Sequence, residues 1–138
     1  MTKKRADTPR ERERYVIVSL PEAEQFLLSL HQQKDVADRV LIKLMKQLEY
    51  LERFGRYLER PHAAKLAGYE GLYELRVADE SGWYRLFYGF GPADANGATQ
   101  VALVHGVMKH EENPPLAEYV RAEARLREWK KSPGTPTR

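Results

Sequence analysis

Residues 66–109 constrain the fold of this chain more than any other stretch, because apolar and polar residues alternate there with the period of a β-strand. Three strands are predicted, over residues 72–77, 83–90 and 100–108. The intervening segments 79–82 and 91–97 are rich in the glycine, proline, aspartate and asparagine that favour turns. We therefore expect this stretch to form the sheet around which the rest of the chain is arranged.

Strict alternation assigns the polar side chains of these strands to particular faces of the sheet. Glu74 and Arg76 share one face of the first strand. Arg85 and Tyr88 point to opposite faces of the second strand. On the third strand, the odd-numbered residues 101–107, which include His105, are expected to share one face.

The segment before the sheet is predicted to contain one short strand and two helices. Residues 14–18 form a β-rich run, and Pro21 lies in the first turn of a helix that continues to about residue 33. A longer helix has Asp35 as its N-cap and Gly55 at its end, and its apolar residues recur every three or four positions. The two helices are expected to form a hairpin that covers one face of the sheet.

A last helix is predicted after the sheet. Asn113 can cap a helix that continues with Pro114, and the pattern extends to about residue 129. The positions expected to be buried are Leu116, Tyr119, Val120, Leu126 and Trp129. The order of one strand, two helices, three strands and one helix predicts a small α+β domain.

A chain of 138 residues, 42% of them apolar, can build one modest core. We expect a single domain over residues 14–129, between a mobile basic arm (1–13) and a disordered tail (130–138). The sequence has no run of about eighteen apolar residues, which argues against a membrane span. It has no cysteine, which fits a cytoplasmic protein, and its net charge of +3 permits contact with a polyanion without requiring it.

The strand region resembles a known family. Its motifs, in chain order, are Leu72-Tyr73-Glu74-Leu75-Arg76, Gly82-Trp83-Tyr84-Arg85-Leu86-Phe87-Tyr88 and His105-Gly106-Val107-Met108-Lys109. Together with a helical hairpin that ends at Gly55, this ordered set resembles the phage-derived, HigB-like toxins of the RelE/ParE superfamily across residues 15–129. The resemblance implies a helical hairpin packed on a small, twisted, mainly antiparallel sheet, with a C-terminal helix.

The resemblance also implies a function. Toxins of this kind belong to type II toxin–antitoxin systems and cleave messenger RNA in the ribosome, so the chain is expected to be an mRNA endonuclease (an mRNA interferase). The expected partners are the messenger RNA and a cognate antitoxin with a helix-turn-helix domain. No metal or nucleotide cofactor is expected, because the sequence has neither metal-ligand spacing nor a glycine-rich phosphate loop.

Carried over residue by residue, the resemblance places the functional cluster on the open face of the sheet and in the segment after its last strand. The implied catalytic residues are Arg85, Arg76, Glu74, His105 and Lys109, and the implied RNA-binding residues are Lys65, Tyr88 and His110. The chain departs from the family pattern at three places. His110 stands where a second lysine is common, Asn113-Pro114 where a threonine often precedes the helix proline, and Trp83 where a smaller residue is usual.

These residue types suit RNA cleavage in which the 2′-OH attacks the adjacent phosphate. The reaction needs a base, an acid and cations that stabilise the phosphorane. Arg76 and Arg85 can supply positive charge, Glu74 or His105 can act as the base, and Lys109 or His105 can act as the acid.

Structural interpretations of the same residues stay open. Glu74 and Arg76 can be exposed strand charges, Arg85 can stack on neighbouring aromatic rings, and His105 can be a hydrogen-bonded core histidine. Two other functions also stay open: a non-catalytic toxin of the superfamily that inhibits DNA gyrase, and an inactive relative that only binds its antitoxin. Gyrase-directed relatives tend to lack the basic and histidine positions found here, which favours the nuclease.

Overall fold

The computed structural model describes residues 13–33, 38–59, 62–80, 82–110 and 114–133. In chain order the elements are β1 (Tyr15–Ser19), α2 (Pro21–Gln32), α3 (Asp38–Phe54), the 3₁₀ turn η2 (Gly55–Tyr57), β2 (Ala63–Lys65), β3 (Tyr73–Asp79), β4 (Gly82–Ala93), β5 (Thr99–Lys109) and α4 (Leu116–Lys131). Within the described ranges no helix is long and apolar enough to cross a membrane. Asp35, Asn113 and most of the predicted arm and tail lie outside these ranges.

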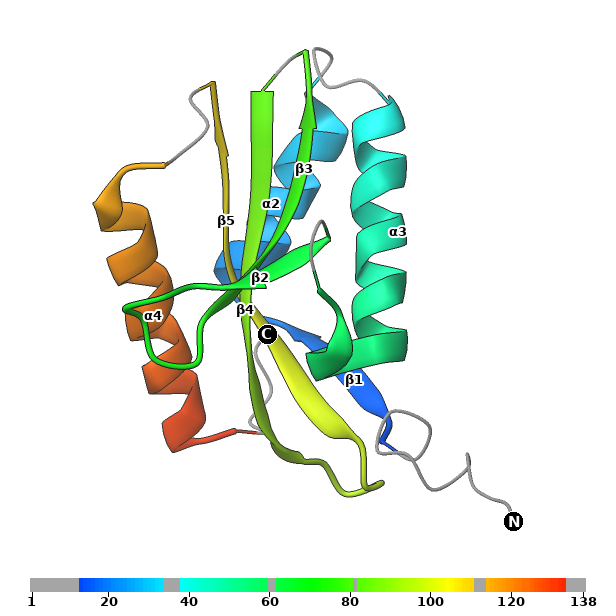
Figure 1. The fold of residues 1–138 in the computed structure, drawn as a ribbon, viewed down its shortest axis with the longest axis vertical. Helices are drawn as coiled ribbons and strands as arrows, with labels where there is room; N and C mark the ends of the chain where they lie inside the picture. The colour runs from blue at the N-terminus through cyan, green and yellow to red at the C-terminus, as the bar shows by residue number, and fades with distance from the viewer. Residues whose placement is uncertain (1–12, 34–37, 60–61, 81, 111–113, 134–138) are drawn as a thin grey trace.

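The strands form one five-stranded sheet in the order β1-β5-β4-β3-β2 (Figure 1). Strand β1 runs parallel to β5, and the other neighbouring strands are antiparallel. The protein therefore has the α+β architecture that the order of elements predicted, with a mixed sheet and a C-terminal helix.

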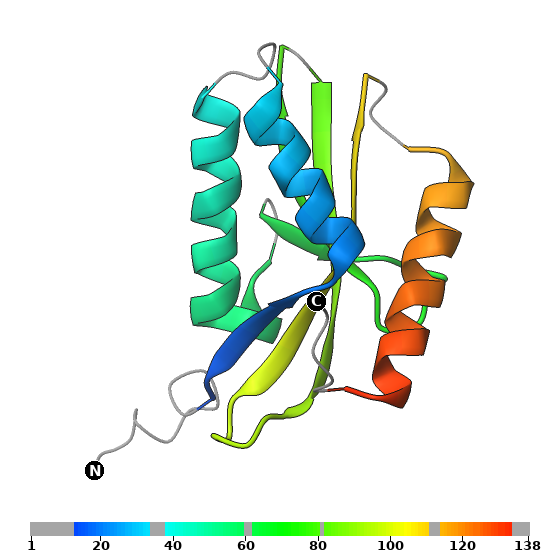
Figure 2. The same cartoon turned by 180° about the vertical axis from the view of Figure 1, so that it is seen from behind.

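Helices α2 and α3 cover one face of this sheet (Figure 2). Val40, Leu44 and Leu51 of α3 are fully buried in the core that this hairpin shares with the sheet. Burial of each such side chain stabilises the fold by roughly 1.5–3 kcal/mol. Helix α3 ends at Phe54, and Gly55 follows with φ of +53°, a conformation that favours glycine. The apolar stripe and the glycine stop predicted for this helix are confirmed.

Helix α4 packs on the opposite face, so that face is partly covered and not open as expected (Figure 1). Leu126 and Trp129, in its C-terminal half, are buried there, as predicted. Leu116 and Val120 are 71% and 56% exposed, so the prediction that they are buried is wrong. The helix begins at Leu116, with a proline in the N-cap position, and ends at Lys131, two residues later than predicted.

Two features of the sheet were not predicted. No strand was predicted for Ala63–Lys65, because the three-residue strand β2 is too short for an alternating pattern. In the pairing of β4 with β5, Phe87 is opposite His105 but Tyr88 is opposite Leu103, so Val104 is the extra residue of a β-bulge. After the bulge, the odd-numbered residues of β5 point to the opposite face, so His105 lies on the α4 face. The prediction that the odd-numbered residues 101–107 share one face is therefore wrong.

Gly106 follows the bulge, and its lack of a side chain leaves room for Phe26 of α2, whose ring a Cβ atom would overlap. We expect Gly106→Ala to lower the free energy of unfolding by about 1–3 kcal/mol through overpacking. Urea unfolding of Gly106→Ala, Phe26→Leu and the double variant measures the coupling. The shorter leucine should reduce the cost of the alanine, whereas purely additive effects would contradict this contact.

Candidate functional site

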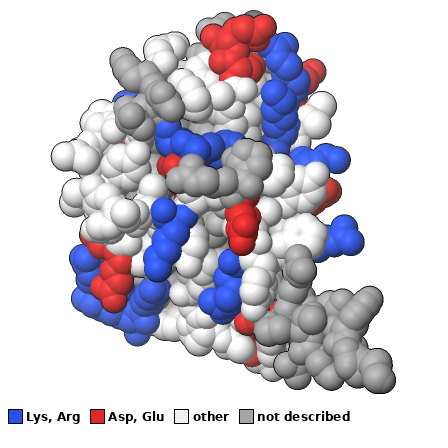
Figure 3. Space-filling view, viewed as in Figure 1, with Lys and Arg blue, Asp and Glu red and all other residues white. Residues whose placement is uncertain are grey.

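The α4 face of the sheet carries the five residues predicted to be catalytic. Glu74 and Arg76 come from β3, and Arg85 of β4 is directly opposite Arg76 in the strand register. His105 reaches this face because of the bulge, and Lys109 lies at the end of β5. Figure 3 shows basic side chains in the middle of this face, which is the one opposite the helical hairpin.

Glu74 lies between two arginines. Its Oε1 accepts a hydrogen bond from Arg85 Nη1 at 2.8 Å, and both side chains are buried, with 4% and 2% of their surface exposed. Its Oε2 lies 3.6 Å from Arg76 Nε, and the Arg76 side chain is 27% exposed. Glu74 is therefore a buried partner and not the exposed strand charge of the structural interpretation, while Arg76 presents its charge to solvent.

Arg85 is buried on this face, and one of its guanidinium nitrogens has no hydrogen-bond partner within the described residues. Its guanidinium carbon lies 5.8 Å from the centre of the Trp83 ring, so the predicted aromatic contact is present. Its buried Nη2 has no hydrogen-bond partner within the part of the chain that the structure describes. A buried donor without a partner is costly, so Arg85 is held here at the expense of one unmade hydrogen bond.

His105 has partners at both ring nitrogens. Nε2 lies 2.7 Å from Glu118 Oε1, and Nδ1 is bonded to Arg125 Nη1. A guanidinium can only donate, so Nδ1 accepts and Nε2 carries the proton. Burial lowers the pKa of His105, the hydrogen bond to Glu118 raises it, and the charge of Arg125 lowers it, with a net decrease. The ring stacks on Phe87 with centroids 5.9 Å apart. His105 thus fits the core-histidine interpretation in this state.

Glu118, in the first turn of α4, is the acceptor for several cationic groups. Arg121 Nη1 lies 3.3 Å from its Oε1, and Lys109 Nζ lies 3.7 Å from its Oε2. Burial raises the pKa of Glu118, but the hydrogen bond from His105 and the surrounding positive charges bring it below its ordinary value. Glu118 is therefore ionised at neutral pH and joins α4 to the end of β5.

Aromatic rings connect the two groups of charges. Tyr119 stacks on Tyr69 with centroids 5.4 Å apart and meets Phe87 edge to face at 5.5 Å. Burial raises the pKa of the Tyr119 phenol, and the negative charge of Glu74 raises it further. Tyr119 therefore stays protonated at neutral pH beside the Glu74 pair.

Of the three predicted RNA-binding residues, two lie away from this cluster and the third directly follows Lys109 in the chain. Tyr88 is 1% exposed on the hairpin face and stacks on Tyr73, and burial raises the pKa of its phenol. Lys65, at the end of β2, lines an open hollow of about 370 Å³ with Arg56 and Tyr73. His110 is exposed just after β5. The structure does not bring these residues together with Glu74 and the arginines.

The apolar stripe of α4 does not reveal four residues of the site, of which Tyr119 was predicted only as a core residue. They are Glu118, Tyr119, Arg121 and Arg125. Spacings of three and four residues along a helix would have placed the acidic and basic members on one face. Among the described residues, no group of three histidines or carboxylates is arranged to hold a metal ion.

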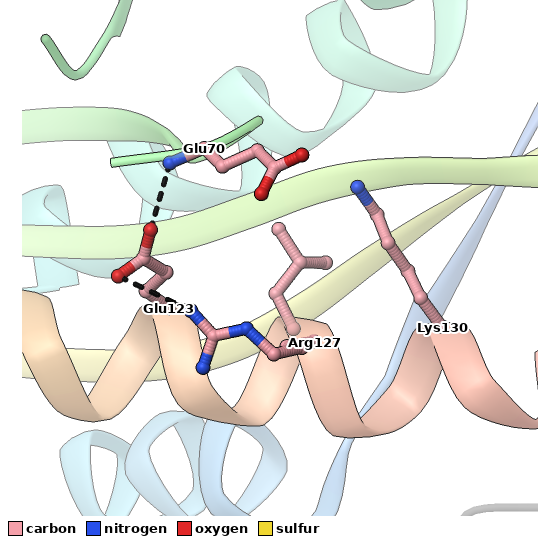
Figure 4. A pocket seen from close by; sticks show the side chains of 5 residues that line it. Glu70, Glu123, Arg127 and Lys130 are labelled. Atoms are coloured by element: carbon pink, nitrogen blue, oxygen red, sulfur yellow. Dashed lines mark hydrogen bonds and ion pairs between the residues drawn. The ribbon is translucent and has the colours of Figure 1, made fainter. Parts of the chain in front are cut away.

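A pocket of about 150 Å³ lies where α4 meets the loop between β2 and β3 (Figure 4). Two carboxylates, two cationic side chains and one leucine line it: Glu70, Glu123, Arg127, Lys130 and Leu126. The backbone N–H of Glu70 donates to Glu123 Oε2 at 2.8 Å. This bond joins α4 to the loop that carries Tyr69, next to the stacked rings of Tyr69 and Tyr119.

Comparison with known protein families identifies the family of this chain. Residues 29–127 match the sequence model of the phage-derived Gp49-like proteins (DUF891), and this match covers most of the chain. The chain belongs to the phage-derived Gp49-like family. Membership is compatible with a toxin of a toxin–antitoxin pair. A search of curated proteins found no match.

We expect the stability of this Gp49-like protein to fall as the pH is lowered from about 7 towards about 5. Burial keeps the pKa of folded His105 below its ordinary value of 6.5, so the unfolded chain takes up this proton first. Because the unfolded state binds more protons in this range, the free energy of unfolding rises with pH. Urea unfolding at several pH values measures the slope. His105→Gln should flatten it, and His31→Gln, at an exposed position of α2, should not; equal slopes in all three proteins would contradict the prediction.

Proposed function

We propose that this Gp49-like protein is the toxin of a type II toxin–antitoxin system and that it cleaves messenger RNA on the ribosome by acid–base chemistry without a metal. The observation that supports this most is the gathering of two arginines, a lysine, a histidine and a carboxylate from three strands on one face. Metal-free cleavage requires this combination, because the phosphorane needs cations and the two oxygens need proton transfer.

The exposure of these side chains suggests different roles in the proposed reaction. Arg76 and Lys109, 27% and 34% exposed, are accessible to a phosphate oxygen, whereas Arg85 lies behind and orients Glu74. As the 2′-oxygen bonds to phosphorus it loses its proton to a base, and the 5′-oxygen leaves with a proton from an acid. His105 can serve in these transfers only after Glu118 releases its Nε2.

A cognate antitoxin is part of this proposal. Three large apolar side chains on the outer surface of the hairpin are at least half exposed: Leu28, Ile42 and Met45. Ile42 and Met45 also line an open hollow of about 430 Å³. Exposed apolar side chains beside a hollow favour an amphipathic partner helix. Co-expression with the neighbouring gene product, followed by copurification, tests for this partner.

The direct test is to induce the chain in growing cells and follow both growth and message integrity. Growth arrest with cleaved messages is expected for the wild type, and we expect Lys109→Ala to slow cleavage by about tenfold or more. Lys131→Ala is the matched control, because Lys131 lies on α4 and pairs with Glu128 at the surface. Arrest with intact messages would contradict the nuclease.

Gyrase inhibition is the second candidate, and one observation favours it. Both nitrogens of His105 are bonded and Arg85 is buried, so neither side chain is available to a substrate in this state. A non-catalytic toxin needs only a binding surface. Blocked DNA supercoiling by purified gyrase, with messages left intact, would support this candidate over the nuclease.

A further inference from the structure

Three hydrogen-bond donors from two elements converge on the single carboxylate of Glu118. They are His105 Nε2 at 2.7 Å, Arg121 Nη1 at 3.3 Å and Lys109 Nζ at 3.7 Å. Several donors around one anionic group form the kind of site that also holds a phosphodiester.

His105 is held in place by contacts other than Glu118. Arg125 bonds to His105 Nδ1 and also lies 3.7 Å from Glu22 of α2, while Phe87 stacks on the imidazole ring. Lys109 extends from β5 and Arg121 from α4 independently of each other. The His105 ring is therefore positioned by the fold and by Arg125, and the Glu118 carboxylate lies between this ring, Lys109 and Arg121.

Glu118 is held by bonds that a ligand can replace. The Lys109 and Arg121 side chains are 34% and 51% exposed, and ion pairs of exposed side chains contribute little to stability. Rotation of the Glu118 side chain towards solvent would free all three donors.

We propose that His105, Lys109 and Arg121 form a phosphodiester-binding subsite for RNA, and that the Glu118 carboxylate occupies this subsite in the free protein. The proposal rests on the proposed RNA-cleaving function for the identity of the ligand. It makes Arg121 a substrate-binding residue and Glu118 a competitor of the substrate. It also accounts for the bonded state of His105, whose Nε2 becomes available when the phosphate displaces Glu118.

The test measures binding in place of cleavage. The probe is a 2′-O-methyl RNA oligonucleotide, which lacks the attacking hydroxyl. Glu118→Gln removes the negative charge and keeps the shape, so it should bind the probe at least about fivefold more tightly than the wild type. Glu128→Gln makes the same change at a 77% exposed position of α4, and screening should keep its effect under about twofold. Lys109→Ala in the Glu118→Gln background should remove the gain.

Two results would overturn the proposal. Equal binding by Glu118→Gln and Glu128→Gln would mean that only overall charge matters, and weaker binding by Glu118→Gln would make Glu118 a support of the site and not a competitor.

Inorganic phosphate separates this inference from the proposed function. Nuclear magnetic resonance of the His105 ring should detect phosphate at lower concentration in Glu118→Gln than in the wild type. If phosphate behaves in this way but no variant binds the RNA probe, the anion subsite stands and RNA is the wrong ligand. If phosphate leaves the His105 signals unchanged in both proteins, the subsite is refuted even where RNA is cleaved.

Discussion

Arg85→Ala is expected to lower the free energy of unfolding by about 3–5 kcal/mol, because it leaves a carboxylate buried without its main partner. Glu74 is 4% exposed and takes its 2.8 Å hydrogen bond from Arg85. Arg76 remains at 3.6 Å, on the solvent side of the carboxylate, and compensates only in part. Urea unfolding followed by circular dichroism measures the loss, and a loss below about 1 kcal/mol would contradict the buried pair.

A double variant separates the charges from the packing. Glu74→Leu together with Arg85→Met removes both charges and keeps most of the volume, so its stability should lie within about 2 kcal/mol of the wild type or exceed it. A large loss of stability in the double variant would mean that the Glu74–Arg85 hydrogen bond stabilises the fold by more than the cost of burying the two charges. These stability measurements also matter for function. If Arg85→Ala fails to arrest growth, they show whether lost stability, and not lost catalysis, is the cause.

The helical hairpin could be predicted from the sequence because local signals decide it. The stripe of Val40, Leu44 and Leu51 has the period of a helix, and the glycine after the last turn adopts the left-handed conformation expected there. These residues act within one or two turns of the chain, so no knowledge of distant contacts is needed.

The composition of the site depends on distant contacts, and the sequence alone did not determine it. The bulge at Val104 arises from the pairing of β5 with β4. This single extra residue moves His105 from the face that strict alternation gives it, with Val101 and Leu103, to the α4 face. Burial of Glu74 depends in turn on Arg85, eleven residues away on the next strand. The sequence motifs therefore identified residues that lie close together in the structure. Only the strand pairing shows that Arg85 is a buried partner of Glu74.

The position of α4 is the largest difference from the expected site. The pattern of apolar residues predicted a helix, but it could not tell which part of the helix would touch the sheet. Leu126 and Trp129 anchor the C-terminal half, while the N-terminal half brings Glu118 and Arg121 to His105. This face was expected to be open to RNA, but the Glu118 carboxylate occupies part of it. A cationic side chain on this face can therefore bind RNA only if it is exposed to solvent.

By that criterion, Arg76 is the arginine whose loss should affect activity most directly. If the protein cleaves RNA as proposed, we expect Arg76→Ala to slow cleavage by about 10²–10³-fold, because the Arg76 charge can reach the phosphorane. The free energy of unfolding should change by less than about 1 kcal/mol. Cleavage of a message in a purified translation system measures the rate, and urea unfolding measures the stability. Arg76→Lys should recover part of the rate, since lysine keeps the charge but cannot hold two phosphate oxygens.

Arg127→Ala is the matched control for this experiment, because Arg127 is a 61% exposed arginine of α4 that pairs with Glu123. Its cleavage rate should equal that of the wild type. If Arg76→Ala cleaves at the wild-type rate while Arg85→Ala is inactive and unstable, the arginines of this face are structural. The positive charge that acts on RNA would then have to come from the end of β5 and α4, where Lys109 and Arg121 surround Glu118.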